Sequence, residues 1–202
     1  FLLVPLDAPG ITIRPIKQLN GLTGFAEIFF DDVEVPVANR VGDEGAGWAI
    51  AMATAGFERG LMLRSPARFQ QTAKQLVALY LRHREAADAD PSIRDAVMRS
   101  WVAAEAYALA TYRTACRLAK GGQIGAEAST NKIFWSELDL LMHETAMAIL
   151  GARAELMAHA PDAGDVGHWL DGFLFAQAGP IYAGTNEIQR NIIAERMLGL
   201  PR

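Results

Sequence analysis

The C-terminal stretch, residues 181–202, carries residue types that could bind a ligand. It opens with a tight turn at Ala183-Gly184, and the following Thr185 is a favoured helix N-cap residue. The start of a helix presents free backbone N–H groups, which attract anions or the electron-rich edges of rings. The same pattern, with isoleucines on one helical face, is also that of an ordinary amphipathic helix that closes a bundle.

A second candidate is Glu58, which lies next to Arg59 in a stretch with helical periodicity. Gly56 and Gly60 flank this charged pair, and a glycine inside a helix costs about 1 kcal/mol relative to alanine. Two such glycines indicate that something approaches the backbone closely at this point. The pattern alone favours a solvated helix residue for Glu58, and Arg59 is compatible with a surface ion pair.

The composition excludes several classes of function. The chain has 202 residues, 51% of them hydrophobic, and a formal net charge of −4. This is the profile of a globular protein, and it gives no electrostatic case for binding nucleic acid or an anionic membrane surface. The single cysteine, Cys116, excludes an internal disulfide and suits a reducing compartment, so we expect a cytoplasmic protein. No apolar run reaches the length of a membrane span.

Hydrophobic periodicity divides the chain into a β part and a helical part. Residues 1–42 predict the C-terminal part of a β-domain, and residues 43–202 predict a helical bundle domain. The predicted strands are Phe1–Val4, 11–14 and 25–30, and the predicted helices are 48–84, 91–120, 126–150, 169–177 and a last helix after Thr185. The predicted fold class is therefore mainly α, an antiparallel helical bundle preceded by a remnant of a β-domain.

Neither a metal site nor a phosphate loop is predicted. His159 and His168 are too far apart in the sequence to form a helical ligand pair. Residues 43–48 contain two glycines but lack the Lys and Ser/Thr of a P-loop, so we interpret them as a hinge and a helix start.

Residues 182–190, YAGTNEIQR, and Ile192-Ile193-Ala194 form a long, ungapped match to one protein family. They resemble the C-terminal signature of the acyl-CoA dehydrogenases. The resemblance covers the whole chain but only the C-terminal half of a family member. Since the first residues already look like a buried strand and no initiator Met is present, we expect a fragment or a processed piece.

The resemblance implies an FAD-dependent enzyme that removes two hydrogens from the α and β carbons of an acyl-CoA thioester. It implies cofactor contacts by Tyr182, Thr185, Asn186 and Glu187, and substrate contacts by Gly56, Phe57, Arg59, Ala183 and Gly184. Reduced flavin would pass its electrons to an acceptor resembling the electron-transfer flavoprotein. The implied assembly is a homotetramer or a heterotetramer with a related subunit.

The resemblance also implies where the catalytic base lies. Many family members carry a glutamate immediately before the Gly-Thr pair, but this chain has Ala183, whose methyl group cannot take a proton. A subset of the family, including isovaleryl- and long-chain-type enzymes, places the base on the first long helix of the C-terminal domain. Glu58 matches that position, so we expect Glu58 to abstract the α-proton, with its basicity raised by an apolar, water-poor setting.

Two departures from the family concern cofactor contacts. The family's Arg-x-x-Phe-Gly motif corresponds to residues 82–87, RHREAA, and its Gln-x-x-Gly-Gly segment corresponds to residues 148–152, AILGA. Both motifs serve the flavin of a neighbouring subunit. Residues 127–137 resemble actinobacterial-type members, some of which assemble from two related subunits with fewer flavins than chains. We therefore expect a related partner to supply the missing flavin contacts, or a homotetramer with rearranged ones.

Two other functions remain open at this stage. A non-catalytic assembly subunit predicts no flavin reduction, and an acyl-CoA oxidase predicts oxygen consumption without an added electron acceptor. The sequence does not define the acyl group.

Overall fold

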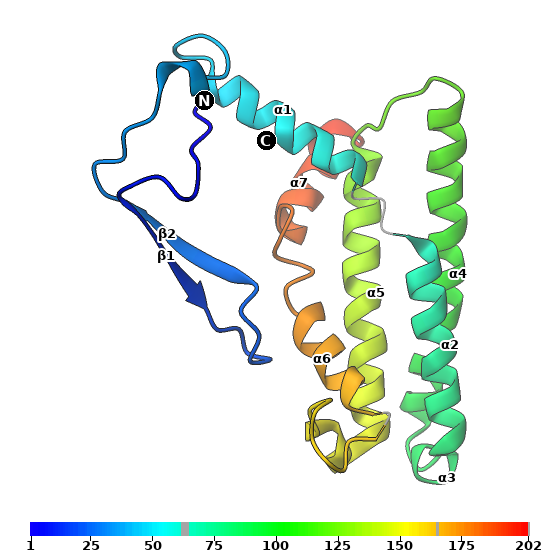
Figure 1. Cartoon of the computed structure of the whole chain (residues 1–202). Helices are drawn as coiled ribbons and strands as arrows, with labels where there is room; N and C mark the ends of the chain where they lie inside the picture. Colours follow the sequence, from blue (N-terminus) through cyan, green and yellow to red (C-terminus); the bar gives the residue numbers. More distant parts are fainter. Residues whose placement is uncertain (62–64, 165, 202) are drawn as a thin grey trace. The chain divides into compact units, whose positions relative to one another are not determined.

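The structure is a computed structural model, and it describes residues 1–61, 65–164 and 166–201 (Figure 1). For residues 55–61 only the helix to which they belong is described. The chain forms two compact units, Phe1–Arg59 and Gly60–Arg202, and each is described by itself.

The first unit contains a hairpin and a helix. Strand β1 (Ile11–Ile16) pairs antiparallel with β2 (Phe25–Phe30), with Ile11 opposite Phe30. A 3₁₀ turn, η1 (Val37–Asn39), and helix α1 (Gly47–Leu61) follow. The two strands predicted near residues 11–14 and 25–30 are thus confirmed.

The predicted strand at Phe1–Val4 is wrong. Leu2 makes only an isolated bridge to Arg40, and no continuous ladder forms. An apolar run becomes a strand only when a neighbouring strand pairs with it, and the described part of this unit offers only the β1–β2 hairpin.

The second unit is built on three long helices. Helix α2 (Pro66–Arg82) leads through the short α3 (Arg84–Ala87) into α4 (Pro91–Ala119), and α5 (Glu127–Leu150) follows. These long helices run antiparallel and side by side in Figure 1, and α5 packs against both α2 and α4. The short connections force this up-and-down arrangement.

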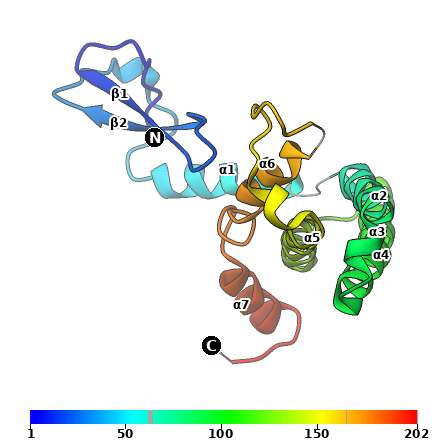
Figure 2. The ribbon, with the colours of Figure 1, turned by 90° about the horizontal axis from the view of Figure 1, so that it is seen from below.

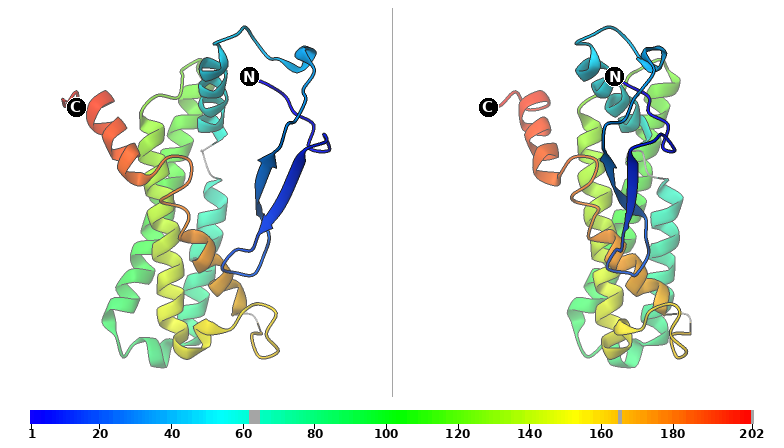
Figure 3. Two further views of the ribbon diagram at one scale, coloured as in Figure 1. Left: turned by 90° about the vertical axis from the view of Figure 1, so that its left-hand side faces the viewer. Right: turned by 60° about the vertical axis from the view of Figure 1, so that its left-hand side comes forward.

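The chain then returns along α5. A 3₁₀ segment, η2 (Gly151–Glu155), precedes α6 (Gly167–Ala176) and α7 (Asn186–Arg196), and both helices pack on α5. Seen from below, α5 lies between α6 and the α2–α4 pair (Figure 2). Figure 3 shows α7 beside the first half of α5. Helix α5 is therefore the central element against which the C-terminal turn is held.

Helix boundaries follow local sequence signals. Asp90 caps α4 by accepting a hydrogen bond from the Ser92 backbone N–H at 2.9 Å, and Pro91 takes the first helical position. Between the helices predicted to end at residue 84 and to begin at residue 91, the structure has the short helix α3. An ion pair between Arg84 and Asp88, N to O 3.1 Å, spans one turn of this segment.

The core of the second unit is aromatic and aliphatic. Phe69, Tyr107 and Trp135 are each at most 1% exposed. The rings of Phe69 and Tyr107 meet edge to face, with centroids 5.0 Å apart. The predicted fold class, mainly α with a small β element, is confirmed. The predicted domain boundary at residues 42–43 stays a prediction.

No helix in the described ranges combines the length and the apolar character needed to cross a membrane.

Candidate functional site

The turn before α7 has an unusual backbone. Ala183 and Gly184 both have positive φ, 57° and 85°. Such angles are rare for residues with a β-carbon, and the small methyl group of alanine reduces the crowding. Tyr182 precedes them, and its ring stacks on Trp135 of α5 with centroids 5.8 Å apart and planes 30° from parallel. The turn is therefore anchored on the central helix by an aromatic contact.

Side chains of α7 itself close the turn. Thr185 caps the helix, its Oγ1 accepting a hydrogen bond from the Ile188 N–H at 3.3 Å. The buried amide of Gln189 donates from Nε2 to the carbonyl oxygens of Ala183 and Gly184 at 3.1 and 3.3 Å. These contacts fix the orientation of both peptide groups before the helix begins.

Asn186, the first residue of α7, points inward and is 3% exposed. Its Oδ1 accepts hydrogen bonds from Lys132 Nζ at 2.7 Å and from Ser136 Oγ at 3.2 Å. Its backbone N–H donates to the Pro180 carbonyl oxygen at 2.9 Å. The predicted cofactor contact by Asn186 stays a prediction, since the described contacts of this side chain all lie inside the protein.

Glu187 lies on the outer side of the same turn. Its pKa is below the ordinary value for glutamate, first because its own backbone N–H donates to the carboxylate and then because the Thr185 hydroxyl does so. Arg190 lies 4.0 Å from this carboxylate and forms a closer ion pair with Glu137, at 2.5 Å. Glu187 is thus an anionic acceptor at neutral pH, suited to hydroxyl or N–H groups and unsuited to phosphate.

The structure brings five of the predicted residues together on this turn, namely Tyr182, Ala183, Gly184, Thr185 and Glu187. Asn186 lies directly beneath them. Glu58, Gly56, Phe57 and Arg59 belong to α1, but their side-chain positions lie outside the described residues. Their predicted roles as base and substrate contacts stay predictions.

The turn before α7 carries little side-chain bulk and one charged acceptor. A β-carbon at Gly184 would lie 2.6 Å from Gln189 Nε2, so glycine at this position leaves room for the Gln189 amide and adds no side chain to the turn. Ala183 adds only a methyl group, and Glu187 offers a charged acceptor. In the described residues this turn brings together no cationic group that could bind a pyrophosphate directly, because Lys132 is buried and Arg190 is paired with Glu137.

Four residues of this site were not predicted as site residues: Lys132, Trp135, Ser136 and Gln189. Each acts on the turn from beneath. A lysine within an apolar helical segment is the one available sequence signal, because a lysine is almost never fully buried without a partner. The partner itself, Asn186, carries no local signal.

A separate polar cluster lies in the core between α2, α5 and α6. Arg68 Nη2 donates to Asp139 Oδ2 at 2.9 Å, and His143 Nδ1 donates to the Asp139 carbonyl oxygen at 2.8 Å. Burial lowers the pKa of His143, while that hydrogen bond and the Asp139 charge oppose the shift. Trp169 packs edge-on against His143.

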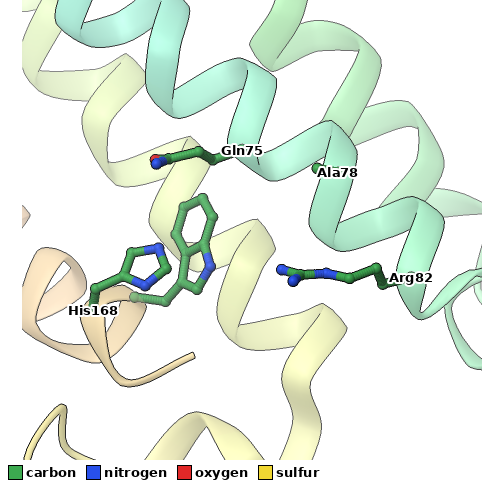
Figure 4. A pocket seen from close by; sticks show the side chains of 5 residues that line it. Gln75, Ala78, Arg82 and His168 are labelled. Carbon is green, nitrogen blue, oxygen red and sulfur yellow. The ribbon is translucent and has the colours of Figure 1, made fainter. Parts of the chain in front are cut away.

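A pocket of about 440 Å³ lies between α2 and α6 (Figure 4). Its described lining residues are Gln75, Ala78, Arg82, His168 and Trp169. The residues of the turn before α7 are not among them. His168 thus lines a cavity, and within the described ranges no group of three or more His, Cys, Asp or Glu side chains could hold a metal ion.

The fold and the turn define a class of protein: a helical bundle domain that ends in a capped turn and a helix laid on the central helix. The family model described as "Acyl-CoA dehydrogenase, C-terminal domain" matches residues 45–198. The chain belongs to the acyl-CoA dehydrogenase family.

Among curated proteins, the chain is similar to the acyl-CoA dehydrogenase IpdE1 of Mycobacterium tuberculosis. The two are 42% identical over 206 residues, which cover 100% of this chain and 51% of IpdE1. IpdE1 of Mycolicibacterium smegmatis is also 42% identical, with 49% of its length covered. The chain thus spans about half the length of these relatives.

Solved structures agree on the fold. The ChsE4–ChsE5 complex from Mycobacterium tuberculosis contains a chain with a TM-score of 0.79 and 31% identity, and the match covers 100% of this chain and 52% of that one. The Tcur3481–Tcur3483 steroid ACAD has a TM-score of 0.85 at 23% identity, with the same coverage.

Proposed function

We propose that this chain forms part of an FAD-dependent acyl-CoA dehydrogenase in which Glu58 is the base. The observation that carries the proposal is the family membership of the chain combined with Ala183 before Gly184-Thr185. A methyl group at that place leaves the position immediately before Gly184-Thr185 without a carboxylate. Glu58 on α1 is the residue that the family resemblance offers in its place.

In the proposed reaction the Glu58 carboxylate takes the α-proton as the α C–H bond breaks, and a double bond forms between the α and β carbons. FAD, when bound, supplies the acceptor for the β-hydride. At Ala183-Gly184 the turn before α7 contributes a surface with almost no side-chain bulk. Glu187 contributes a hydrogen-bond acceptor for a hydroxyl group. Because carbon acids are weak, the base must work in a site that excludes water.

The test uses the native protein, purified with any subunit that accompanies it. The protein should contain flavin, and adding an acyl-CoA without oxygen should bleach the visible flavin absorbance. Glu58→Gln should keep the flavin and slow the bleaching by about 10²–10⁴-fold, the usual contribution of a catalytic base. Glu144→Gln, the same change at an exposed position of α5, should bleach normally.

Three outcomes would contradict parts of this proposal. Normal bleaching in Glu58→Gln would remove Glu58 from the mechanism. Bound flavin that no acyl-CoA reduces would favour a non-catalytic assembly subunit. Oxygen consumption without an added acceptor would favour an acyl-CoA oxidase over a dehydrogenase that reduces an acceptor resembling the electron-transfer flavoprotein.

We further propose that the chain works in a tetramer, either of identical subunits or with a related partner. Helix α4 carries large apolar residues that are 56–70% exposed, and they lie on the face opposite its buried residues: Met98, Val102, Leu109 and Tyr112. An apolar stripe of this kind favours a protein contact. The similarity to the ChsE4–ChsE5 complex supports a partner that is a related chain.

A partner subunit would also supply contacts to the cofactor that the family motifs make in other members. Arg84, in the stretch that replaces the family's Arg-x-x-Phe-Gly motif, is ion-paired with Asp88. Residues 148–152 carry no side-chain amide and end in a 3₁₀ segment. We propose that a related subunit supplies the groups that bind the pyrophosphate, and flavin content per chain measures this directly.

A further inference from the structure

Among the described residues of the helical unit, Lys132 is a fully buried cation that the proposed reaction does not use. Its side chain lies on α5 and is 0% exposed. Its Nζ donates to Asn186 Oδ1 at 2.7 Å, and among the described residues no carboxylate lies within ion-pair distance of it. Burial lowers its pKa, while the charges of Glu187 and Glu137 oppose the shift.

This arrangement is costly for the protein alone. A buried ammonium group prefers a carboxylate partner, and here it has the oxygen of a neutral amide. Its partner Asn186 is the first residue of α7, where the helix dipole is already positive. The ammonium group of Lys132 therefore lies next to the positive end of the α7 dipole, and this placement lowers folding stability. Its presence there indicates that Lys132 has a role other than stabilising the fold.

The contact also controls where the turn lies. Lys132 Nζ donates to Asn186 Oδ1, and one helical turn away on α5 the Ser136 hydroxyl shares its single proton between that oxygen, at 3.2 Å, and the Ile133 carbonyl oxygen, at 3.0 Å. The Asn186 backbone N–H donates a hydrogen bond to the Pro180 carbonyl oxygen, and Gln189 Nε2 donates to the carbonyl oxygens of Ala183 and Gly184. The segment from Pro180 to Asn186 is thus a turn held by its own hydrogen bonds. The Lys132 hydrogen bond is its strongest polar contact with α5, because one partner is charged.

We infer that Lys132 is a positioning residue: its ammonium group, bonded to Asn186, sets the turn that meets the flavin and makes the potential beneath that turn positive. This inference rests on the proposed function. Because reduced flavin carries more negative charge than oxidised flavin, Lys132 should favour the reduced form. A residue that merely stabilised the fold would not discriminate between the two.

The experiment compares Lys132→Met with Thr145→Val in the native protein with its copurifying subunits. Thr145 is also buried on α5, and its Oγ1 donates to the Leu141 carbonyl oxygen at 2.6 Å, so it provides a matched loss of one buried polar contact away from α7. FAD affinity is measured by titrating the flavin-free protein, and the flavin midpoint potential is measured in the loaded protein.

Lys132→Met should weaken FAD binding at least tenfold and shift the midpoint potential to more negative values. A further tenfold loss confined to the reduced form corresponds to a shift of about 30 mV for a two-electron couple. Asn186→Ala should weaken binding to a similar extent, and the double variant should be no worse than either single variant, since both remove one connection. Thr145→Val should change neither quantity.

If Lys132→Met does not fold, Ser136→Ala removes the hydroxyl that shares its proton between Asn186 Oδ1 and the Ile133 carbonyl oxygen, and it should weaken FAD binding by about twofold to threefold without Lys132 being changed. Lys132→Met with wild-type affinity and potential would overturn the inference while leaving the proposed function intact. Equal effects of Lys132→Met and Thr145→Val would also overturn it. Wild-type protein that binds no FAD would instead overturn the proposed function itself.

Discussion

The amide of Gln189 and the backbone of Gly184 depend on each other. Gln189 Nε2 donates to the Gly184 carbonyl oxygen at 3.3 Å, and it occupies the space that a side chain at Gly184 would need. A β-carbon there would lie 2.6 Å from that nitrogen, and the φ of +85° already disfavours any other residue. Gly184 thus permits both the turn and the hydrogen bonds that hold it.

Gly184→Ala should therefore destabilise the protein by more than about 1 kcal/mol and weaken FAD binding. The added methyl group strains the backbone and displaces Gln189 from both carbonyl oxygens. Gly121→Ala is the matched control, because Gly121 has a φ of +81° and no atom within 4 Å of a built β-carbon. Denaturant unfolding and FAD titration check this, and equal losses in the two variants would contradict the role of Gln189.

Local signals explain what the sequence could predict. Helices were predicted to begin at residue 91 and after Thr185, and Asp90 and Thr185 cap these helices, each accepting a hydrogen bond from a backbone N–H. Strand β2 has the predicted bounds, since alternating residues between turn signals define it locally. Helix caps and strand ends of this kind depend on residues that are adjacent in the sequence, so a single sequence is enough to predict them.

Features that depend on distant partners could not be predicted in this way. Phe1–Val4 has a strand-like composition, but within the described ranges it makes only the isolated bridge between Leu2 and Arg40. Lys132 and Asn186 are 54 residues apart, and nothing in either segment indicates the other. The inward orientation of Asn186, beneath a turn assigned to a cofactor, follows from packing on α5 and was missed for that reason.

His143 should make stability depend on pH. Its pKa in the folded protein lies below the ordinary value of 6.5, chiefly because of burial, so the unfolded chain binds a proton more readily than the folded one. Asp139, Arg68 and His168 face it from α5, α2 and α6. The free energy of unfolding should therefore be unaffected by His143 well above that pH and should fall as the pH drops through about 6.5.

His143→Gln should remove this component, which cannot exceed about 1.4 kcal/mol per pH unit for one group. Urea unfolding of both proteins at a series of pH values from mildly basic to mildly acidic checks this. The two curves should converge as the pH falls, and parallel curves would contradict a buried neutral histidine.

Arg68 compensates the buried carboxylate of Asp139. Asp139 has a side chain 2% exposed, whereas the Arg68 side chain is 37% exposed. Arg68→Met should destabilise the protein by about 2 kcal/mol, less than the loss for a fully buried pair because water already screens the guanidinium group. Adding Asp139→Asn should recover part of the loss, because no charge then remains buried. Thermal unfolding checks this, and a double variant less stable than Arg68→Met would contradict it.

The apolar stripe of α4 should mediate assembly. Val102 and Leu109 are 62% and 70% exposed and lie two turns apart on the stripe defined above. If another subunit covers this face, a lysine at either position buries an unpaired charge in the interface. The cost is several kcal/mol of binding free energy, as large as the loss at an interface hot spot. Val102→Lys with Leu109→Lys should therefore lower the mass of the native assembly, as measured by light scattering. Leu81→Lys on α2, where the leucine is 59% exposed outside the stripe, should leave the mass unchanged. Because we propose that a related subunit supplies the groups that bind the pyrophosphate, the α4 variant should lose bound FAD together with the partner. Retention of full mass in the α4 variant would place the subunit contact on another face.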